Sequence, residues 1–435
     1  MISPHSRALV PTVLSRRLAL SGLVVLLCAA APPVRQVVSP AVQPRDTLDP
    51  AVSPQIFLVT IGPGEQVWER FGHNAIWVRD PNAGTDVAYN WGMFSFDQEG
   101  FLLRLLRGTM LYWMAPSPIE QMTESYVAAN RSIGVQELAL TADQKVELQR
   151  TLALNARPEN AYYRYDYYRD NCSTRVRDAL DRVLDGRVRA ALEGVPTGAT
   201  YRFHTLRLLE GMPLMYAGIQ VVLSRKADLE IDRWEEGFIP VKLMEALRDV
   251  WVPDGSGGET PLVITEHELY RSTGPPEPTT VPGQVLGYLV LGVSIAVALL
   301  LLSARPNGWA RVSLVLVAGG WSLIAGTVGV VLLGAWLFTD HVFWYPNANV
   351  LLFNPFLLVL GVLVLPLLVR AEPLRWAVTM GVIVAGMSLL GVAVKVFSGV
   401  DQQNGEILAL TLPPNLALLG ALLRLRASAR ATSPP

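Results

Sequence analysis

The stretch YRDNCSTRVRDALDRVLDG, residues 168–186, predicts a helix that begins at a cysteine. Asp170 or Asn171 is suited to cap its first turn, and Gly186 is a natural C-terminal stop. Apolar side chains follow at the spacing of one buried helix face: Val176, Ala179, Leu180, Val183 and Leu184. Cys172 precedes Val176 by four positions, so its side chain belongs to that inward face, at the amino end of the helix.

The thiol of Cys172 has two interpretations. Unsatisfied backbone N–H groups and the positive end of the helix dipole favour thiolate at a helix start, which is typical of a nucleophile. A small buried side chain with a packing role is the alternative. The other cysteine of the chain, Cys28, lies in an apolar N-terminal run, so the two do not suggest a disulfide framework.

The region before this helix predicts strands, because it is rich in β-branched and aromatic residues between Gly, Pro and Asn. The expected strands are IFLVTIG (56–62), NAIWVRD (74–80) and DVAYNWG (86–92), with a hairpin turn at PNAGT (81–85). Helices are expected over 117–130 and 141–155, the second with Thr141 as its N-cap. One α+β domain over residues 55–252 follows from this mixed pattern.

Two side chains on the expected strands are candidate partners of the thiol. His73 follows Gly72 at the start of a strand, and a cysteine nucleophile needs such a base. A third residue usually orients the imidazole, and Asn90 is preferred over Asp86 for that role. The alternatives are a histidine that is simply packed or exposed, and an asparagine that serves a turn.

The segments on either side of this domain are expected to direct its export and to act as linkers. Arg16 and Arg17 precede the apolar run 18–31, so residues 1–31 are expected to be a signal peptide or a signal anchor. Leu27 precedes Cys28 where a lipoprotein signal needs a small residue, which argues against lipidation there. Residues 32–54 and 253–282, rich in Pro, Ser, Gly or Thr, are expected to be linkers.

The last third of the chain predicts a membrane domain over 283–425. Five apolar segments, near 283–303, 310–338, 350–369, 375–398 and 406–423, are each long enough to cross a bilayer. Arginines occur in the loops after the first and third segments and in the tail, but no Lys or Arg occurs in the other two loops. The positive-inside rule therefore predicts a cytoplasmic tail at 426–435 and an extracytoplasmic 55–252 domain, in a multi-pass inner-membrane protein. A net charge of −1 gives no indication of nucleic-acid binding.

Four motifs of this domain resemble the DUF4105 family, the Lnb-type N-terminal periplasmic domain. They are FGHNAIWV, YNWGMFSF, YDYYRDNCSTRVRD and ADLEIDRWEEGFIP. FTDHVFWYPNANVLLFNP and the five segments resemble the Lnb-like transmembrane domain. The order of these residues, with a histidine on a strand and later a cysteine at a helix start, is also similar to that in the permuted NlpC/P60 and lecithin:retinol acyltransferase-like group. The resemblance implies a papain-like α+β domain joined to five transmembrane helices.

The activity that this resemblance implies is acyl transfer. Lnb-type proteins move an acyl chain from the diacylglyceryl group of a lipoprotein to its terminal α-amine. His73 would then be the base and Cys172 the nucleophile that forms a thioester, with lipoproteins and the bilayer as partners. The alternatives are a Cys/His hydrolase of peptidoglycan amides or phospholipid esters, and a non-catalytic membrane assembly protein. No cofactor and no metal are expected, since the histidines lack metal-binding spacings.

Five further residues are candidate substrate contacts, each with a structural alternative. Three of them lie near the cysteine in the sequence: Arg175, Tyr168 and Asn171. They could bind an anion or form the wall of a cleft, or else form ion pairs and packing contacts with nearby residues of the protein. Those in the aromatic loop could contact substrate, or else anchor the membrane boundary or face protein: Trp344 and Asn349. Three residues are interpreted as scaffold: Arg131, Asp228 and Trp234.

Overall fold

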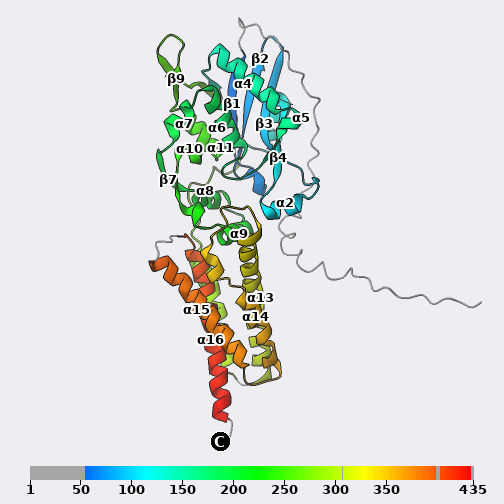
Figure 1. The fold of residues 1–435 in the computed structure, drawn as a ribbon, viewed down its shortest axis with the longest axis vertical. Helices are drawn as coiled ribbons and strands as arrows, with labels where there is room; N and C mark the ends of the chain where they lie inside the picture. Colours follow the sequence, from blue (N-terminus) through cyan, green and yellow to red (C-terminus); the bar gives the residue numbers. More distant parts are fainter. Residues whose placement is uncertain (1–53, 306, 398–401, 433–435) are drawn as a thin grey trace, which may run out of the picture. The chain divides into compact units, whose positions relative to one another are not determined.

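The computed structural model describes residues 54–305, 307–397 and 402–432, so the expected signal segment (1–31) and nearly all of the first linker lie outside the described residues. The chain has an α/β part followed by apolar helices, which confirms the predicted change of character along the sequence. Figure 1 shows a sheet of strands with helices packed on it, and a bundle formed by the later helices.

A seven-stranded antiparallel sheet forms the centre of the α/β part, in the order β11-β5-β1-β2-β3-β4-β6. The strands are β1 (Gln55–Ile61), β2 (His73–Asp80), β3 (Thr85–Met93), β4 (Leu111–Pro118), β5 (Ile133–Leu138), β6 (Tyr162–Arg164) and β11 (Val263–Tyr270). The three predicted strands and their hairpin are therefore confirmed. Asp80 pairs with Thr85 across the predicted turn.

Both faces of this sheet are covered, because side chains alternate along each strand. Ile76 and Val78 belong to the larger core, together with Val176 and Leu180 of α6 (Cys172–Val183). Ala75 and its neighbours on the other face pack against α3 (Ile119–Ala128). The apolar face predicted for the cysteine helix is thus the face by which α6 lies on the sheet.

Shorter elements complete the α/β part. Thr141 caps α4 in a reciprocal capping box with Gln144, as the predicted helix start requires. The remaining helices are α2 (Phe101–Arg107), α4 (Ala142–Asn155), α5 (Pro158–Ala161), α7 (Arg187–Leu192), α8 (Tyr201–Leu208), α9 (Pro213–Val222), α10 (Arg233–Glu236) and α11 (Pro240–Leu247), with 3-10 turns η1 (Val67–Glu69) and η2 (Arg225–Asp228). Two small sheets pair β7 (Pro196–Thr200) with β8 (Glu230–Asp232) and β9 (Trp251–Pro253) with β10 (Glu259–Pro261).

The segment expected to be a linker, 253–282, is not structureless along its whole length. β10 and β11 fall within it, and β11 is an edge strand of the main sheet. Most of its side chains are exposed, so its pattern carries no apolar face and gave no strand signal. Ladder hydrogen bonds to β5, rather than side-chain burial, hold it in place.

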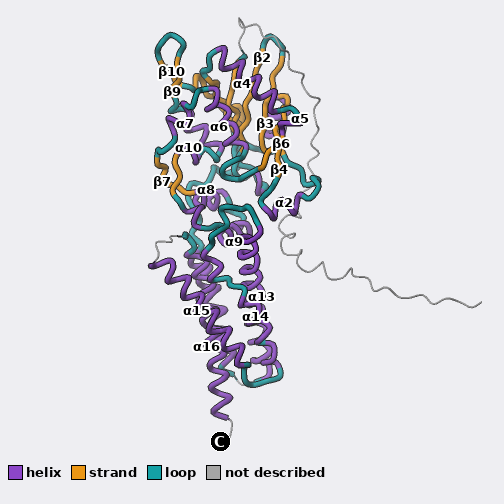
Figure 2. The backbone as a smooth tube through the Cα atoms, in the orientation of Figure 1, coloured by secondary structure: helices purple, strands orange, loops and turns teal. Residues whose placement is uncertain are grey.

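Five helical segments in the last third are long and apolar enough to cross a membrane, as predicted. They are α12 (Val285–Ser303), α13 (Gly308–Phe338), the segment from η3 (Ala348–Leu351) through α14 (Phe356–Leu363) to η4 (Leu365–Leu368), α15 (Arg375–Phe397) and α16 (Gly405–Thr432). Figure 2 shows these helices in purple, with the third interrupted by loop segments.

Polar contacts join α9 to the loops of the helical part. Asn347 donates its Nδ2 hydrogens to the carbonyl oxygens of Val221 and Val222, at 3.1 and 2.8 Å. Glu406, at the start of α16, accepts from the hydroxyl of Tyr216 at 3.1 Å. These buried bonds tie the C-terminal end of the α/β part to residues that flank the apolar helices, because unpaired polar groups there would be costly.

Candidate functional site

The first turn of α6 is organised by Asn171. Its Oδ1 accepts from the backbone N–H groups of Ser173 and Thr174, both at 2.9 Å, so Asn171 is the N-cap. Its Nδ2 donates to the carbonyl oxygens of Tyr167 and Phe238 at 3.1 and 3.0 Å. The predicted cap is therefore confirmed, and the amide that was also a candidate substrate contact is fully engaged with the protein's own backbone.

Ser173 connects this helix start to strand β2. Its hydroxyl donates to the carbonyl oxygen of Gly237 at 2.6 Å and accepts from Nδ2 of Asn74 at 3.0 Å. Asn74 also donates to the carbonyl oxygen of Pro240 at 3.3 Å. The start of α6 is thereby held against the first residues of β2, where His73 lies.

Cys172 is partly exposed and lies at the first helical position. The backbone N–H groups of Asn74 and Ser173 point to its sulfur and lower the pKa of the thiol, as does the positive charge of Arg131. Burial outweighs all of these effects, so the pKa of Cys172 is raised above its ordinary value. The helix start therefore favours the thiolate, as expected, but desolvation is the larger effect.

His73 and Cys172 are brought to the same end of β2. The sulfur receives the backbone N–H of Asn74, which directly follows His73 in the chain. Gly92 packs against Cys172 as well, with φ of 91°, and a Cβ there would come within 3.3 Å of the Cys172 Cβ. No hydrogen bond between the described side chains of His73 and Cys172 joins them in this structure. The two predicted residues nevertheless lie at the same end of β2.

Asn90 orients the imidazole. Its Nδ2 donates to the carbonyl oxygen of Ala88 at 3.2 Å and to the Ser117 hydroxyl at 3.1 Å, which leaves Oδ1 facing His73. His73 Nε2 lies 3.1 Å from that oxygen, so Nε2 carries the proton and Nδ1 is the basic nitrogen of the neutral ring. The structure thus places Asn90 where a third member of the site was predicted.

The imidazole is held neutral. Burial lowers the pKa of His73 to about 4, with a smaller lowering by the charge of Arg131, while the bond to Asn90 acts in the opposite direction. At neutral pH the site therefore contains a neutral thiol and a neutral imidazole. Such a pair can transfer a proton during a reaction but is not a preformed thiolate–imidazolium pair.

Arg131 is a residue of this site that the sequence analysis assigned to the scaffold. Its guanidinium is buried, donates from Nε to the carbonyl oxygen of Gly62 at 3.0 Å, and lies 3.6 Å from a Glu69 carboxylate oxygen. It also lies 4.9 Å from the ring centroid of Tyr126, which in turn neighbours His73. Nη2 is buried without a hydrogen-bond partner among the described residues. No local motif marks it, since its partners come from distant segments.

Two other predicted contacts line clefts beside the helix start. Arg175 pairs with Asp170, with Nη2 and Oδ2 separated by 2.7 Å, and lines a cleft of about 480 Å³. Tyr168 is buried, bonds the Thr205 hydroxyl at 2.7 Å and lines a cleft of about 400 Å³. Neither cleft is lined by Cys172 or His73.

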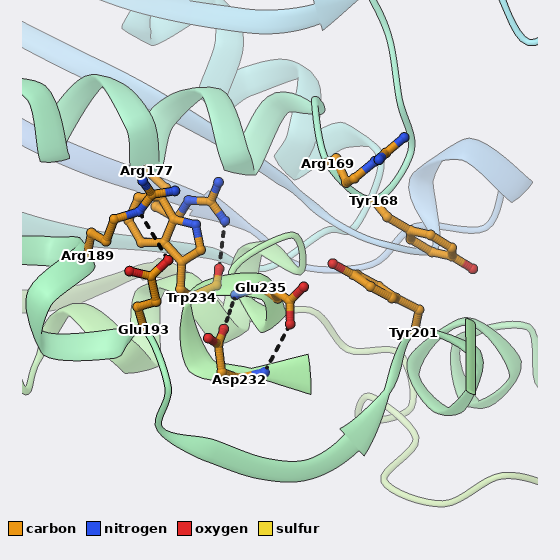
Figure 3. Close-up of a pocket in the computed structure, with 9 residues that line it drawn as sticks. All are labelled: Tyr168, Arg169, Arg177, Arg189, Glu193, Tyr201, Asp232, Trp234 and Glu235. Carbon is orange, nitrogen blue, oxygen red and sulfur yellow. Dashed lines mark hydrogen bonds and ion pairs between the residues drawn. The ribbon is translucent and has the colours of Figure 1, made fainter. Parts of the chain in front are cut away.

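The smaller cleft is strongly charged. Figure 3 shows Tyr168 and Tyr201 on one side, and Trp234 on the other with two guanidinium groups beside it. Arg177 and Arg189 lie 3.8 and 4.6 Å from the Trp234 ring centroid. Trp234, which the sequence analysis interpreted as scaffold, is thus a wall that these cations cover.

The two candidate substrate contacts in the loop after α13, Trp344 and Asn349, contact other parts of the protein than the cysteine helix. Trp344 stacks on the ring of His341, with centroids 4.0 Å apart. Asn349 is buried, donates to the carbonyl oxygen of Val221 at 2.9 Å and accepts from Asn404 at 2.9 Å. These bonds join the loop to α9 and α16. The described residues also contain no group of three or more His, Cys, Asp or Glu side chains able to hold a metal ion.

Comparison with known proteins gives one match. A family model described as the Lnb N-terminal periplasmic domain matches residues 45–210, a range that contains His73, Asn90, Arg131 and Cys172. No curated protein and no solved structure matches the chain. The match and the five apolar helices together indicate a multi-pass membrane protein with a periplasmic domain.

Proposed function

We propose that this protein is a membrane-bound thiol acyltransferase, because the model of the Lnb N-terminal periplasmic domain family matches residues 45–210. Its substrates are lipid-modified, most specifically diacylglyceryl lipoproteins whose acyl chain moves to their own terminal α-amine. The α/β part is proposed to be a permuted papain-like domain of the NlpC/P60 type. The family match supports a role related to lipoprotein processing, and the site supports the chemistry.

The observation that carries the proposal is the oriented His73, whose chain neighbour Asn74 directs its backbone N–H at the Cys172 sulfur. Asn90 keeps the proton on Nε2, so Nδ1 is free to accept the thiol proton as the sulfur attacks the ester carbonyl carbon. The S–C bond forms, the ester C–O bond breaks, and His73 returns the proton to the leaving alcohol. The products are an acyl-thioester on Cys172 and a lysolipid hydroxyl.

The second half of the reaction reverses these roles. The neutral α-amine of the lipoprotein attacks the thioester carbonyl, an N–C bond forms, and the C–S bond breaks. His73 takes a proton from the amine and the thiol is regenerated. Water in place of the amine would give a fatty acid instead, which is the outcome for the alternative hydrolase.

Charge near the reacting atoms supports this chemistry. The negative charge that develops on the substrate oxygen needs donors that are already in place. The buried Arg131 guanidinium is such a donor, because its Nη2 has no hydrogen-bond partner among the described residues. A resting thiolate is not required, because the proton leaves as the S–C bond forms.

The proposed setting is the inner membrane, with the site on the periplasmic side. The family model names a periplasmic domain. Arginines occur in the loops after the first and third apolar segments and after the fifth, which supports a cytoplasmic C-terminus. The ester of a membrane lipid would then lie at the interface on the same side as the domain.

Mass spectrometry of lipoprotein N-termini tests the proposal. Cells with the protein should contain lipoproteins with an N-acyl chain and a lyso-glyceryl group, and cells with Cys172→Ser or His73→Ala should not. Purified protein mixed with lipoprotein substrate should also form an adduct at Cys172 that neutral hydroxylamine releases. Identical N-termini with and without the protein would overturn the acyl-transfer reaction, and full activity of either variant would overturn these catalytic roles. Free fatty acid with unchanged N-termini would favour the hydrolase.

A further inference from the structure

Helix α2 and the loops beside it expose an unusually apolar surface. Its exposed side chains, which we call the α2 patch, are Trp68, Phe96, Leu102, Leu103 and Leu106, each 43% to 52% exposed. Phe96 joins the members together, since its ring lies 5.6 Å from Trp68 and 5.2 Å from Phe101 of α2. A contiguous apolar surface of this kind on a water-exposed domain usually marks a contact with a partner or a membrane.

The α2 patch is fixed next to the end of a membrane helix. The backbone N–H of Asp340 donates to the carbonyl oxygen of Arg107 at 2.8 Å, and Nε2 of His341 bonds the carbonyl oxygen of Leu105 at 2.8 Å. Gly108 packs so closely on this loop that a Cβ there would lie 2.9 Å from the His341 nitrogen. These residues follow α13 directly, and Phe338 at the end of α13 is 77% exposed. The leucines therefore lie at the level where an apolar helix leaves the membrane.

Charges on α2 suit the same surroundings. Arg104 and Arg107 lie in its last turn, and neither forms an ion pair with a residue that the structure describes. Leucines next to arginines that form no ion pair with the described residues are typical of a short segment in the interfacial zone of a membrane. There the leucines contact lipid acyl chains and the arginines contact lipid phosphate groups. The patch is thus complementary to a phospholipid leaflet.

A series of aromatic rings continues from the α2 patch into the core cluster against which Cys172 packs. Phe94 lies 5.2 Å from Phe96 and is stacked on Tyr112 at 5.1 Å. Tyr112 is stacked on Tyr165 at 4.0 Å, and both tyrosines pack in the core cluster against which Cys172 also packs. We call Phe96, Phe94, Tyr112 and Tyr165 the aromatic ladder. It is a continuous series of aromatic rings that leads from the exposed leucines into the core cluster against which Cys172 packs.

We propose that the α2 patch inserts into the periplasmic leaflet and that the aromatic ladder holds the acyl chain of a membrane lipid whose ester is presented to Cys172. The second half rests on the proposed acyl-transfer function, and the first half does not. The occupant is a lipid, because the patch is joined to the end of α13 and carries unpaired cations next to its leucines. Burial of a chain against stacked rings would supply apolar binding energy.

Photocrosslinking tests the membrane contact without using the reaction. Full-length protein carrying a photoreactive residue at Leu103, in a Cys172→Ala background, is irradiated in nanodiscs of phosphatidylethanolamine and phosphatidylglycerol. Phospholipid adducts should form at position 103. The matched control is Ile264, an apolar residue of edge strand β11 that is also more than half exposed. Adducts at 264 equal to those at 103, or none at 103, would overturn the lipid contact.

Alkylation of Cys172 tests the aromatic ladder. Wild-type protein is labelled with iodoacetamide and with a long-chain alkyl iodoacetamide, and the ratio of the two rates is measured. Phe94→Ser should reduce the long-chain rate about tenfold relative to the short one, through loss of apolar contact. Phe57→Ser is the matched control, because Phe57 is also a half-buried ring with a stacked aromatic partner, Trp77, but lies outside the ladder.

The labelling outcomes separate this inference from the function. An unchanged ratio in Phe94→Ser, or an equal fall in Phe57→Ser, would overturn the ladder even if acyl transfer is confirmed. A selective fall in Phe94→Ser with no change in lipoprotein N-termini would keep the lipid-binding path and reject the transfer reaction. Thermal unfolding of both variants shows whether either change in rate follows from loss of the fold.

Discussion

His73 Nε2 lies 3.1 Å from Oδ1 of Asn90, and the two N–H groups of the Asn90 amide are occupied by Ala88 and Ser117. The amide therefore cannot rotate to offer a donor to the ring without losing two hydrogen bonds. This relationship determines which nitrogen of His73 is basic. It turns a histidine on a strand into a candidate acid–base group with a defined direction of proton transfer.

Asn90→Ala should lower acyl transfer about 100-fold while the protein stays folded, because the ring loses its fixed tautomer and orientation. The rate of thioester formation at Cys172, followed by mass spectrometry, measures the effect. Asn160→Ala is the control, since its amide also bonds a backbone carbonyl but is exposed and belongs to a helix end. A wild-type rate in Asn90→Ala would show that Asn90 has only a structural role in strand β3.

The reaction should lose activity on the acid side only at an unusually low pH. His73 must be neutral to accept the thiol proton, and burial lowers its pKa to about 4. Activity should therefore persist below the ordinary histidine pKa of about 6.5 and fall only as the pH approaches that lower value. A pH profile of kcat/KM checks this. Half-loss of activity near the ordinary value would contradict a buried neutral imidazole.

The same lowered pKa has a consequence for stability. The unfolded chain binds a proton to this histidine near pH 6.5, whereas the folded protein does not until about pH 4. Its contribution is fully retained above the unfolded pKa and is lost as the pH falls through that window. Melting temperatures of the full-length protein should decline less steeply over this range in His73→Gln than in the wild type. Parallel slopes would contradict the assignment.

Local patterns account for what the sequence predicted well. The face of α6 depends on apolar spacing within twelve residues, and its cap depends on Asn171 directly before the helix. The membrane helices depend on runs of apolar residues that no soluble fold would leave so exposed. In each case the determining residues are adjacent in the chain, so tertiary structure was not needed.

The protonation state of Cys172 could not be predicted in this way. The helix start favours the thiolate, but the residue is desolvated by segments distant in the chain, including Gly92 next to its Cβ and the core cluster against which it packs. Arg131 was missed for the same reason, since Glu69 and Gly62 contact it from far earlier in the chain. Desolvation and long-range pairing depend on the assembled fold.

Arg131 should contribute to reactivity through its charge. Removing the charge in Arg131→Gln should raise the pKa of the Cys172 thiol further, because the guanidinium lowers it in the wild type. The acyl-transfer rate should fall about 10- to 100-fold. The pH dependence of iodoacetamide labelling separates this from a packing defect: the labelling midpoint should move to higher pH in Arg131→Gln. Arg131→Lys, which keeps the charge, should restore most of the shift. Equal midpoints in both variants would make Arg131 a structural residue.

The buried ion pair of Arg202 and Asp228 should be essential for holding the α/β part on its membrane helices. Both side chains are 1% exposed, Nη2 and Oδ2 are 3.1 Å apart, and the same Oδ2 accepts from the backbone N–H of Gln403 before α16. Asp228→Asn leaves the Arg202 charge buried without its partner, which should destabilise the protein by about 3–5 kcal/mol. Thermal unfolding in detergent measures the loss, and limited proteolysis near residue 403 should become faster. The control is Glu147→Gln, which removes one partner of the exposed pair with Arg150 and should leave the melting temperature unchanged. If Asp228→Asn melts at the wild-type temperature, the contacts of α9 with Asn347 and Glu406 are sufficient to join the two parts.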